Sequence, residues 1–318
     1  MKKLTNRALI SLILKVSGNV NADIGVGTRI PLKKIITWDQ EIRPFISARC
    51  IRRCIREKLY EKGFSIDPLQ MIGPKKREQL GDIGDPVEYV DDDLFGFLRP
   101  QEPPLRRSGP IKISHLISLR HAEIKVEFAA RFPRDFLPKY QHGYPTPFEI
   151  ELAEWLGKLN VIISDRIGRF SDDELSEDIK EKLDGQKSLG REERIRRLTG
   201  FLEVLLWEGW TFPRGSQSSS VPEFYYAVIG LTKRFAPLFG YLDVTEEGKI
   251  NEELIETMRR IYGCLLDKLL ILDYKNGRYL KYVRKPGQEI LAKEKTESLD
   301  SKNISDIIEE ICNYIVQN

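Results

Sequence analysis

Residues 6–17 read Asn-Arg-Ala-Leu-Ile-Ser-Leu-Ile-Leu-Lys-Val-Ser, an apolar run rich in residues that favour strands. A run of this kind predicts a strand that is buried on both faces, at the centre of a sheet. The run resembles the apolar part of a secretory signal, but Lys15 interrupts it and the residues that follow make a poor cleavage site. No other stretch is long enough to span a bilayer, so we expect no membrane partner and a cytoplasmic location.

After this strand, the sequence predicts a loop, an edge strand and a helix. Residues 17–27 are rich in Gly, Asn and Asp, which is typical of a loop. Residues 28–36 predict an edge strand or hairpin arm, because Pro31 cannot donate a hydrogen bond to a ladder. A helix is predicted over residues 47–62, with Ser47 as its N-cap.

Residues 64–110 predict an irregular inserted region with short strands at best, because prolines and glycines recur in short clusters. Within it, Asp91-Asp92-Asp93 favours a solvated acidic turn, with a divalent cation site as the alternative. The segment Leu94-Phe95-Gly96-Phe97-Leu98 either stacks bases or anchors the insert on the core, and we favour the anchor. From residue 109 to residue 128, apolar alternation predicts two paired strands.

The second half of the chain predicts mainly helices. One strand is expected over residues 223–231, and helices are expected over residues 147–159, 172–184, 190–208, 250–273 and 303–317. The mixed order of strands and helices along the whole chain indicates an α+β fold.

Composition excludes several classes of protein. The chain has 318 residues, with 51 Lys and Arg against 48 Asp and Glu, and 41% of its residues are apolar. Such a mixture can bury a core, which argues against disorder, a collagen-like repeat and a membrane bundle. Residues 1–70 hold 14 Lys and Arg but only 6 Asp and Glu, so positive charge is concentrated there. The 4 cysteines fit reduced thiols better than a disulfide scaffold.

The helix over residues 47–62 carries the clearest functional pattern. Four arginines fall within about one 100° arc of a helical wheel, opposite an apolar stripe. Guanidinium groups in such a row suit the phosphates of a nucleic acid. The alternatives are a solvated face or salt bridges to Asp91-Asp92-Asp93. The cations that precede the helix favour anion binding. The candidate phosphate contacts are Arg29, Lys33, Lys34, Ser47, Arg49, Arg52, Arg53 and Arg56.

Two further segments are candidate RNA contacts. In the loop 17–27, the backbone at Gly18, Asn19 and Asn21 would approach a phosphate closely, although the loop matches neither the Walker nor the dinucleotide pattern. Its alternative is a mobile connection whose glycines permit positive φ. The pair Arg106-Arg107 resembles a basic knuckle at the mouth of a strand.

Catalytic patterns are sparse. The 3 histidines, His115, His121 and His142, lack metal-ligand spacing with one another or with cysteine. Asp23, in the glycine-rich loop, is the one candidate for a general base that acts on a ribose hydroxyl. We therefore predict no metal, no cofactor and no catalytic residue.

In their order along the chain, these segments resemble the DevR-like branch of the repeat-associated RAMP proteins, the backbone subunits of type I CRISPR effector complexes (Cascade). The resemblance is strong over residues 1–130 and vague after residue 150, and no single motif is diagnostic. It is carried by Ser17-Gly18-Asn19-Val20-Asn21, Gly25-Val26-Gly27-Thr28-Arg29, Pro44-Phe45-Ile46-Ser47-Ala48, Arg49-Cys50-Ile51-Arg52-Arg53-Cys54-Ile55-Arg56, Asp93-Leu94-Phe95-Gly96 and Gly109-Pro110-Ile111-Lys112-Ile113-Ser114.

The resemblance implies a modified RRM-like or ferredoxin-like core with an inserted thumb hairpin and helical additions. Residues 1–135, with the strand near 223–231, would form the RNA-binding core, and the thumb region would lie in residues 64–110. Residues 145–318 would be mainly a helical insertion and C-terminal helices packed on the core.

The resemblance also implies a function in antiviral defence. Several copies of the chain would line up head to tail as a helical filament along one guide RNA (crRNA) and present it to target DNA, so that base pairing reads the sequence. Further partners would be the Cascade subunit that caps the five-prime handle, the large subunit and the repeat-processing endoribonuclease. Type I backbone subunits are not nucleases, so we expect no enzymatic activity.

Two alternatives stay open. Relatives in type III complexes cleave target RNA with an aspartate in a comparable loop, and Asp23 would take that role in a metal-dependent ribonuclease. The name DevR itself suggests a regulatory or interaction protein.

Overall fold

A computed structural model describes residues 5–20, 25, 27–73, 78–102, 104–137, 143–213, 221–285, 287–288 and 291–317. The strands are β1 (Arg7–Gly18), β2 (Arg29–Ile30), β3 (Lys34–Ile36), β4 (Ile42–Ile46), β5 (Gln70–Ile72), β6 (Gln79–Gly81), β7 (Leu98–Arg99), β8 (Leu105–Arg106), β9 (Ile111–Ile113), β10 (Leu116–Ser118), β11 (Lys125–Arg131), β12 (Thr146–Ser164), β13 (Glu223–Thr232), β14 (Lys268–Asp273), β15 (Arg278–Val283) and β16 (Ala292–Ser298). The α-helices are α1 (Ala48–Glu61), α2 (Val90–Phe95), α3 (Glu177–Lys182), α4 (Arg191–Glu203), α5 (Glu252–Tyr262) and α6 (Ser301–Ile315).

Strand β1 lies at the centre of the fold, as residues 6–17 predict. In the described part of the chain, twelve strands form one sheet with the main order β16-β15-β14-β13-β1-β12-β10-β4-β3. β1 pairs antiparallel with β12 from Arg7 to Gly18 and with β13 on its other side. Its alternate side chains enter two separate apolar clusters, one on each face of the sheet. A strand buried on both faces needs an apolar run without alternation, which residues 6–17 supply.

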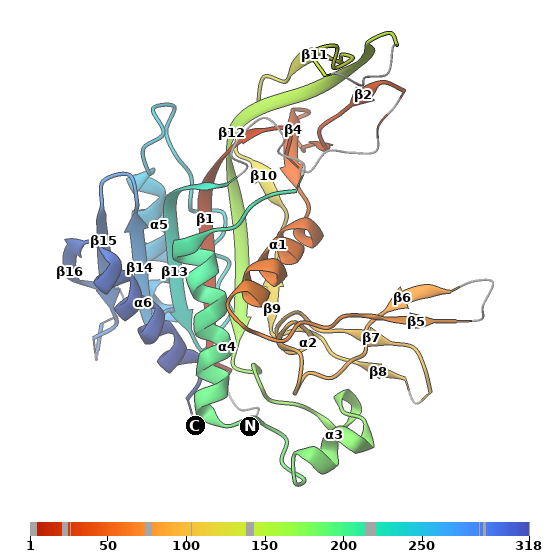
Figure 1. Ribbon diagram of the computed structural model, residues 1–318. Coiled ribbons are helices and arrows are strands. Elements are labelled where there is room, and N and C mark those ends of the chain that lie inside the picture. The colour runs from red at the N-terminus through yellow and green to blue at the C-terminus, as the bar shows by residue number, and fades with distance from the viewer. Residues whose placement is uncertain are drawn as a thin grey trace.

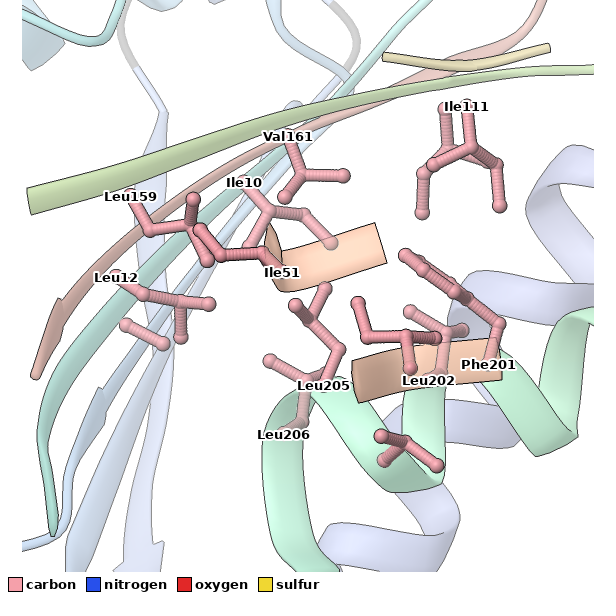
Figure 2. Close-up of a cluster of buried hydrophobic side chains, with 14 of the residues drawn as sticks. Ile10, Leu12, Ile51, Ile111, Leu159, Val161, Phe201, Leu202, Leu205 and Leu206 are labelled. Atoms are coloured by element: carbon pink, nitrogen blue, oxygen red, sulfur yellow. The ribbon is translucent and has the colours of Figure 1, made fainter. Parts of the chain in front are cut away.

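Helices cover both faces of this sheet (Figure 1). α1, α4 and α6 pack on one face, where Ile51 and Phe201 share one apolar cluster with residues of the sheet such as Ile10 and Val161 (Figure 2). α5 packs on the other face, through Ile255 and Met258. The α+β class is therefore confirmed, with a mostly antiparallel sheet and helices in both outer layers.

The prediction of a helix over residues 147–159 is wrong, because this segment belongs to β12. Ala153, Trp155, Leu159 and Val161 face the core with the period of a strand. Trp155 and Leu159 are four residues apart, a spacing that fits a helix as well as a strand. The long pairing with β1 settles the ambiguity in favour of a strand.

Three other expectations about the strands and helices need correction. The helix expected over residues 250–273 ends at Tyr262, and residues 268–273 form β14 between β13 and β15. The strands in residues 109–128 pair with β12 rather than with each other. The second half is not mainly helical, because β12–β16 contribute to the same sheet as β1. The helices at 190–208 and 303–317 and the strand at 223–231 are confirmed.

The insert of residues 64–110 has two short hairpins, β5–β6 and β7–β8, and the helix α2. Leu94, Phe95 and Phe97 are buried, so the aromatic segment anchors the insert, as favoured from the sequence. Gly96 has a φ of 78°, and a Cβ there would lie 2.2 Å from the Arg107 carbonyl oxygen. Only glycine fits this close approach between the two sides of the insert.

A buried ion network joins the insert to the rest of the protein. Arg107 donates to the carboxylates of Asp93 at 2.6 Å and Glu174 at 2.7 Å, and its side chain is fully buried. Arg197 of α4 donates to the other oxygen of Asp93 at 3.1 Å. The amide N–H of Gly168 also donates to Asp93. The network therefore links the insert to residues 168–174 and to α4.

Candidate nucleic-acid interface

The arginine stripe lies on α1, which forms where the sequence predicts it. The hydroxyl oxygen of Ser47 accepts a hydrogen bond from the Cys50 amide at 3.2 Å, so Ser47 caps the helix. Ile51, Ile55 and Leu59 are buried against the sheet, which turns the arginines away from the core. The amide of Ala48, in the same first turn, donates to Nδ1 of His115 at 2.9 Å.

Two of the four arginines have carboxylate partners within the chain. Arg56 donates through Nε to Asp91 at 2.7 Å and lies over the ring of Phe95. For Arg56, the alternative of a salt bridge to the acidic insert is therefore the one that the structure shows. Arg53 is 71% exposed and pairs with Glu57 one turn later at 3.0 Å.

The other two arginines form part of a basic strip, which we define as Arg49, Arg52 and Lys112. In the described part of the chain, none of the three pairs with a carboxylate. Burial lowers the pKa of Arg52, and the charges of Arg56 and Arg49 add to this shift. Burial also lowers the pKa of Lys112, with further contributions from Arg52 and Arg166. Cations that repel one another without a counter-charge favour the binding of a polyanion.

Lys112 was missed by the sequence reasoning, although a signal was available. It stands between Ile111, which is buried, and Ile113, which packs against the same core, in the short strand β9. A lysine at the outward position of such an alternation faces away from that core. What the sequence does not reveal is that folding brings Lys112 close enough to Arg52 of α1 for their charges to interact.

The cations before α1 are mostly engaged with β12. Arg29 pairs with Glu149 at 3.2 Å, and Lys34 pairs with the buried carboxylate of Glu151 at 2.6 Å. Although burial opposes it, the ammonium of Lys34 and the amide of Leu32 hold the pKa of Glu151 below its usual value. Lys33 is half-buried and carries no such carboxylate pair in the described part of the chain.

The glycine-rich loop is only partly described, since Asn21 and Asp23 lie outside the described residues. Asn19 is buried, and its amide donates to the carbonyl of Glu151 at 2.7 Å, so this side chain holds the loop against β12. The backbone of Gly18, with a φ of 97°, borders a pocket of about 770 Å³. Three glutamates and Lys125 line that pocket, and the excess of negative charge disfavours a phosphate there.

The pair Arg106-Arg107 divides into an exposed and an internal residue. Arg106 is exposed at β8, where a phosphate can reach it. The prediction that Arg107 contacts RNA is wrong, because its guanidinium is enclosed by Asp93 and Glu174. The sequence alone does not distinguish the two adjacent arginines, whereas the fold exposes Arg106 and buries Arg107.

The acidic triplet is buried, so the prediction of a solvated turn is wrong. Asp91, Asp92 and Asp93 lie in α2, where they accept hydrogen bonds from arginines and from backbone amides. The carboxylate oxygens of Asp67, Asp82 and Asp92 all lie within 4.8 Å of one another. Burial, followed by the charges of its acidic neighbours, raises the pKa of Asp92 to about 9.

This shifted pKa predicts a pH dependence of stability. Asp92 binds its proton more tightly in the folded chain than in the unfolded chain, so the free energy of unfolding falls as pH rises from about 4 to about 9. The variant Asp92→Asn should lose part of this dependence and be more stable than the natural chain at pH 8. Urea unfolding at pH 5 and pH 8 measures the effect, with exposed Asp306→Asn as the control. Equal loss of stability in all three proteins would contradict the prediction.

The fold and the strip together describe an α+β protein with an uncompensated basic surface beside α1. A family model described as "CRISPR-associated negative auto-regulator DevR/Csa2" matches residues 79–253, more than half of the sequence. The chain belongs to this CRISPR-associated family, which confirms the resemblance. The matched region extends well beyond residue 150, where the sequence resemblance is vague.

A comparison with solved structures also finds similar chains. A chain of a "CRISPR RNA-guided surveillance complex, pre-nicking" is similar over 96% of this chain and 100% of that chain, with a TM-score of 0.58 and 11% identity. A chain of a "CRISPR RNA-guided surveillance complex" is similar over 81% and 84%, with a TM-score of 0.49 and 13% identity. At 11% identity, the first likeness shows the fold alone. A search among curated proteins finds no match.

No helix in the described residues has both the length and the apolar content that a membrane crossing needs. The four cysteines are free thiols, of which Cys54 and Cys312 are buried.

Proposed function

We propose that the chain is a non-catalytic, RNA-binding backbone subunit of a Cascade-type complex, which holds a guide RNA for pairing with target DNA. The observation that carries the proposal is the basic strip of Arg49, Arg52 and Lys112, which meets no carboxylate in the described part of the chain. Burial, together with neighbouring cations, lowers the pKa values of Arg52 and Lys112. An RNA backbone supplies the missing negative charge at regular intervals and without regard to base sequence.

Two exposed apolar surfaces support assembly of several copies. The first is the arm formed by β11 and the start of β12, which projects from the body of the sheet (Figure 1) and exposes Phe128, Phe132 and Phe136. The second is the β3–β4 hairpin, in which Ile36 lies opposite Ile42 and Trp38 is 92% exposed. Contact between two different apolar surfaces on successive copies is heterologous, and such contacts generate open filaments.

Sedimentation with single-stranded RNA oligonucleotides of increasing length tests the backbone role. The number of bound copies should rise in proportion to RNA length. The variant Phe128→Ser/Phe132→Ser should still bind a short oligonucleotide as one copy, because the strip that binds RNA is unchanged. It should bind long RNA with less cooperativity, because the proposed contact of the arm with the neighbouring copy is weakened. One bound copy at every RNA length would contradict the proposal.

The absence of catalysis needs its own experiment. Incubation with guide RNA, complementary RNA and magnesium should leave both strands intact. Regular cleavage that is lost in Asp23→Ala would instead identify a metal-dependent ribonuclease.

A further inference from the structure

A second cationic feature lies on the face of the sheet opposite α1. A pocket of about 340 Å³ is lined by Lys158 and Asn160 of β12, by Ser114 and His115 between β9 and β10, and by Arg43, Arg120 and Asp243. Ser114 and His115 follow Lys112 in the chain, and His115 contacts the first turn of α1. One wall of the pocket is therefore two residues along the chain from Lys112 of the basic strip and in contact with the first turn of α1.

Lys158 lies between apolar neighbours in the sheet, at a position where an apolar side chain would be expected. Its neighbours across the ladder are Ile13 on β1 and Ile117 on β10. Its ammonium donates to the carbonyl of Leu242 at 3.2 Å, and in the described part of the chain it has no carboxylate partner. Burial lowers the pKa of Lys158, the charge of Asp243 opposes the shift, and Arg120 adds to it. A half-buried ammonium without a counter-ion destabilises the fold, which suggests that it serves a ligand.

The rest of the pocket offers hydrogen-bond donors. Nδ1 of His115 accepts from the Ala48 amide, so in the neutral ring Nε2 carries the proton. Oδ1 of Asn160 accepts from the Ser11 hydroxyl at 2.7 Å, which leaves the amide nitrogen of Asn160 as the donor end. Arg120 balances the charge of Asp243, the one carboxylate in the lining, and Arg43 pairs with Asp39 and Glu41. Lys158 is therefore the lining cation that has no carboxylate partner in the described residues.

We propose that this pocket binds a phosphate group through Lys158, Asn160 and His115. One cation and two neutral donors around a cavity of this size match a ligand that is anionic and rich in acceptors. The phosphate comes either from the RNA strand that lies on the basic strip or from a free nucleotide. The first source rests on the proposed function, whereas the second does not.

The test uses the whole chain with Lys158→Met, which preserves length and removes the charge. Without ligand, this variant should melt at a higher temperature than the natural chain, because a half-buried ammonium without a carboxylate partner is replaced by an apolar group. Inorganic phosphate and adenosine monophosphate, at constant ionic strength, should raise the melting temperature of the natural chain and of Lys249→Met, an exposed-lysine control, but not of Lys158→Met. Fluorescence anisotropy with single-stranded RNA should show binding about tenfold weaker in Lys158→Met.

The outcomes separate the two proposals. A melting temperature that phosphate raises equally in Lys158→Met and in the natural chain, or in neither, overturns the pocket. A phosphate response that depends on Lys158 in a chain that binds no RNA supports the pocket and contradicts the proposed function. Unchanged RNA affinity in Lys158→Met, together with a lost phosphate response, supports the pocket and identifies a free phosphate compound as its ligand.

Discussion

Replacing Arg107 with alanine should lower the free energy of unfolding by about 3–5 kcal/mol, the largest effect that we expect of any single substitution. The guanidinium donates to the carboxylates of Asp93 and Glu174 and to the backbone carbonyls of Asp93, Arg166 and Arg169. Its loss leaves two buried carboxylates with fewer partners, and a buried charge without its partner is costly.

Urea unfolding of the full chain measures this prediction. Arg106→Ala is the matched control. The side chain of Arg106, next to Arg107 in the chain, is exposed, so its replacement should change stability by less than about 0.5 kcal/mol. A chain that fails to fold after Arg107→Ala agrees with the prediction. A loss below about 1 kcal/mol would show that Asp93 keeps enough partners in Arg197 and Gly168 to stay charged without Arg107.

The second large effect concerns RNA. Removal of all three cations of the basic strip, in Arg49→Ala/Arg52→Ala/Lys112→Ala, should reduce the slope of log affinity against log salt by about 2, because each contact to a single strand contributes about 0.7. If the two lines meet near 1 M salt, this difference corresponds to about 100-fold weaker binding at 0.1 M. The loss should be the same for RNAs of unrelated sequence, since phosphates carry no base information.

Arg53→Ala is the control for this series. Arg53 lies on the same helix, but it is exposed and paired with Glu57, so its removal should change the salt slope little. Filter-binding titrations over a range of salt concentrations, with melting curves to confirm folding, measure the effect. A loss in Arg53→Ala as large as that in the triple variant would show that general charge, and not the strip, binds RNA.

Local periodicity by itself determines several elements of this protein. The apolar run of residues 6–17 is β1, the capped amphipathic pattern after Ser47 is α1, and the final pattern is α6. In each case the signal spans one element and agrees with the environment that the fold provides. The arginine stripe belongs to this group, because a helical wheel alone places its members on one face.

Tertiary structure decided the elements whose local pattern is ambiguous. Residues 146–164 contain glutamates, alanine and leucine that favour a helix, yet twelve-residue pairing with β1 makes them a strand. Residues 268–273 are an apolar run that fits either form, and β13 and β15 on either side make it a strand. Burial between two neighbouring strands is a property of the sheet, which no window of sequence contains.

Tertiary structure also decided which charges are free to bind a ligand. By sequence alone Arg49, Arg52, Arg53 and Arg56 are equivalent, and so are Arg106 and Arg107. The difference comes from carboxylates far away in the chain. Asp91 pairs with Arg56, 35 residues earlier, and Glu174 pairs with Arg107, 67 residues earlier. Sequence sets the number and spacing of charges, but the free energy of each charge depends on what folding brings within a few ångströms of it.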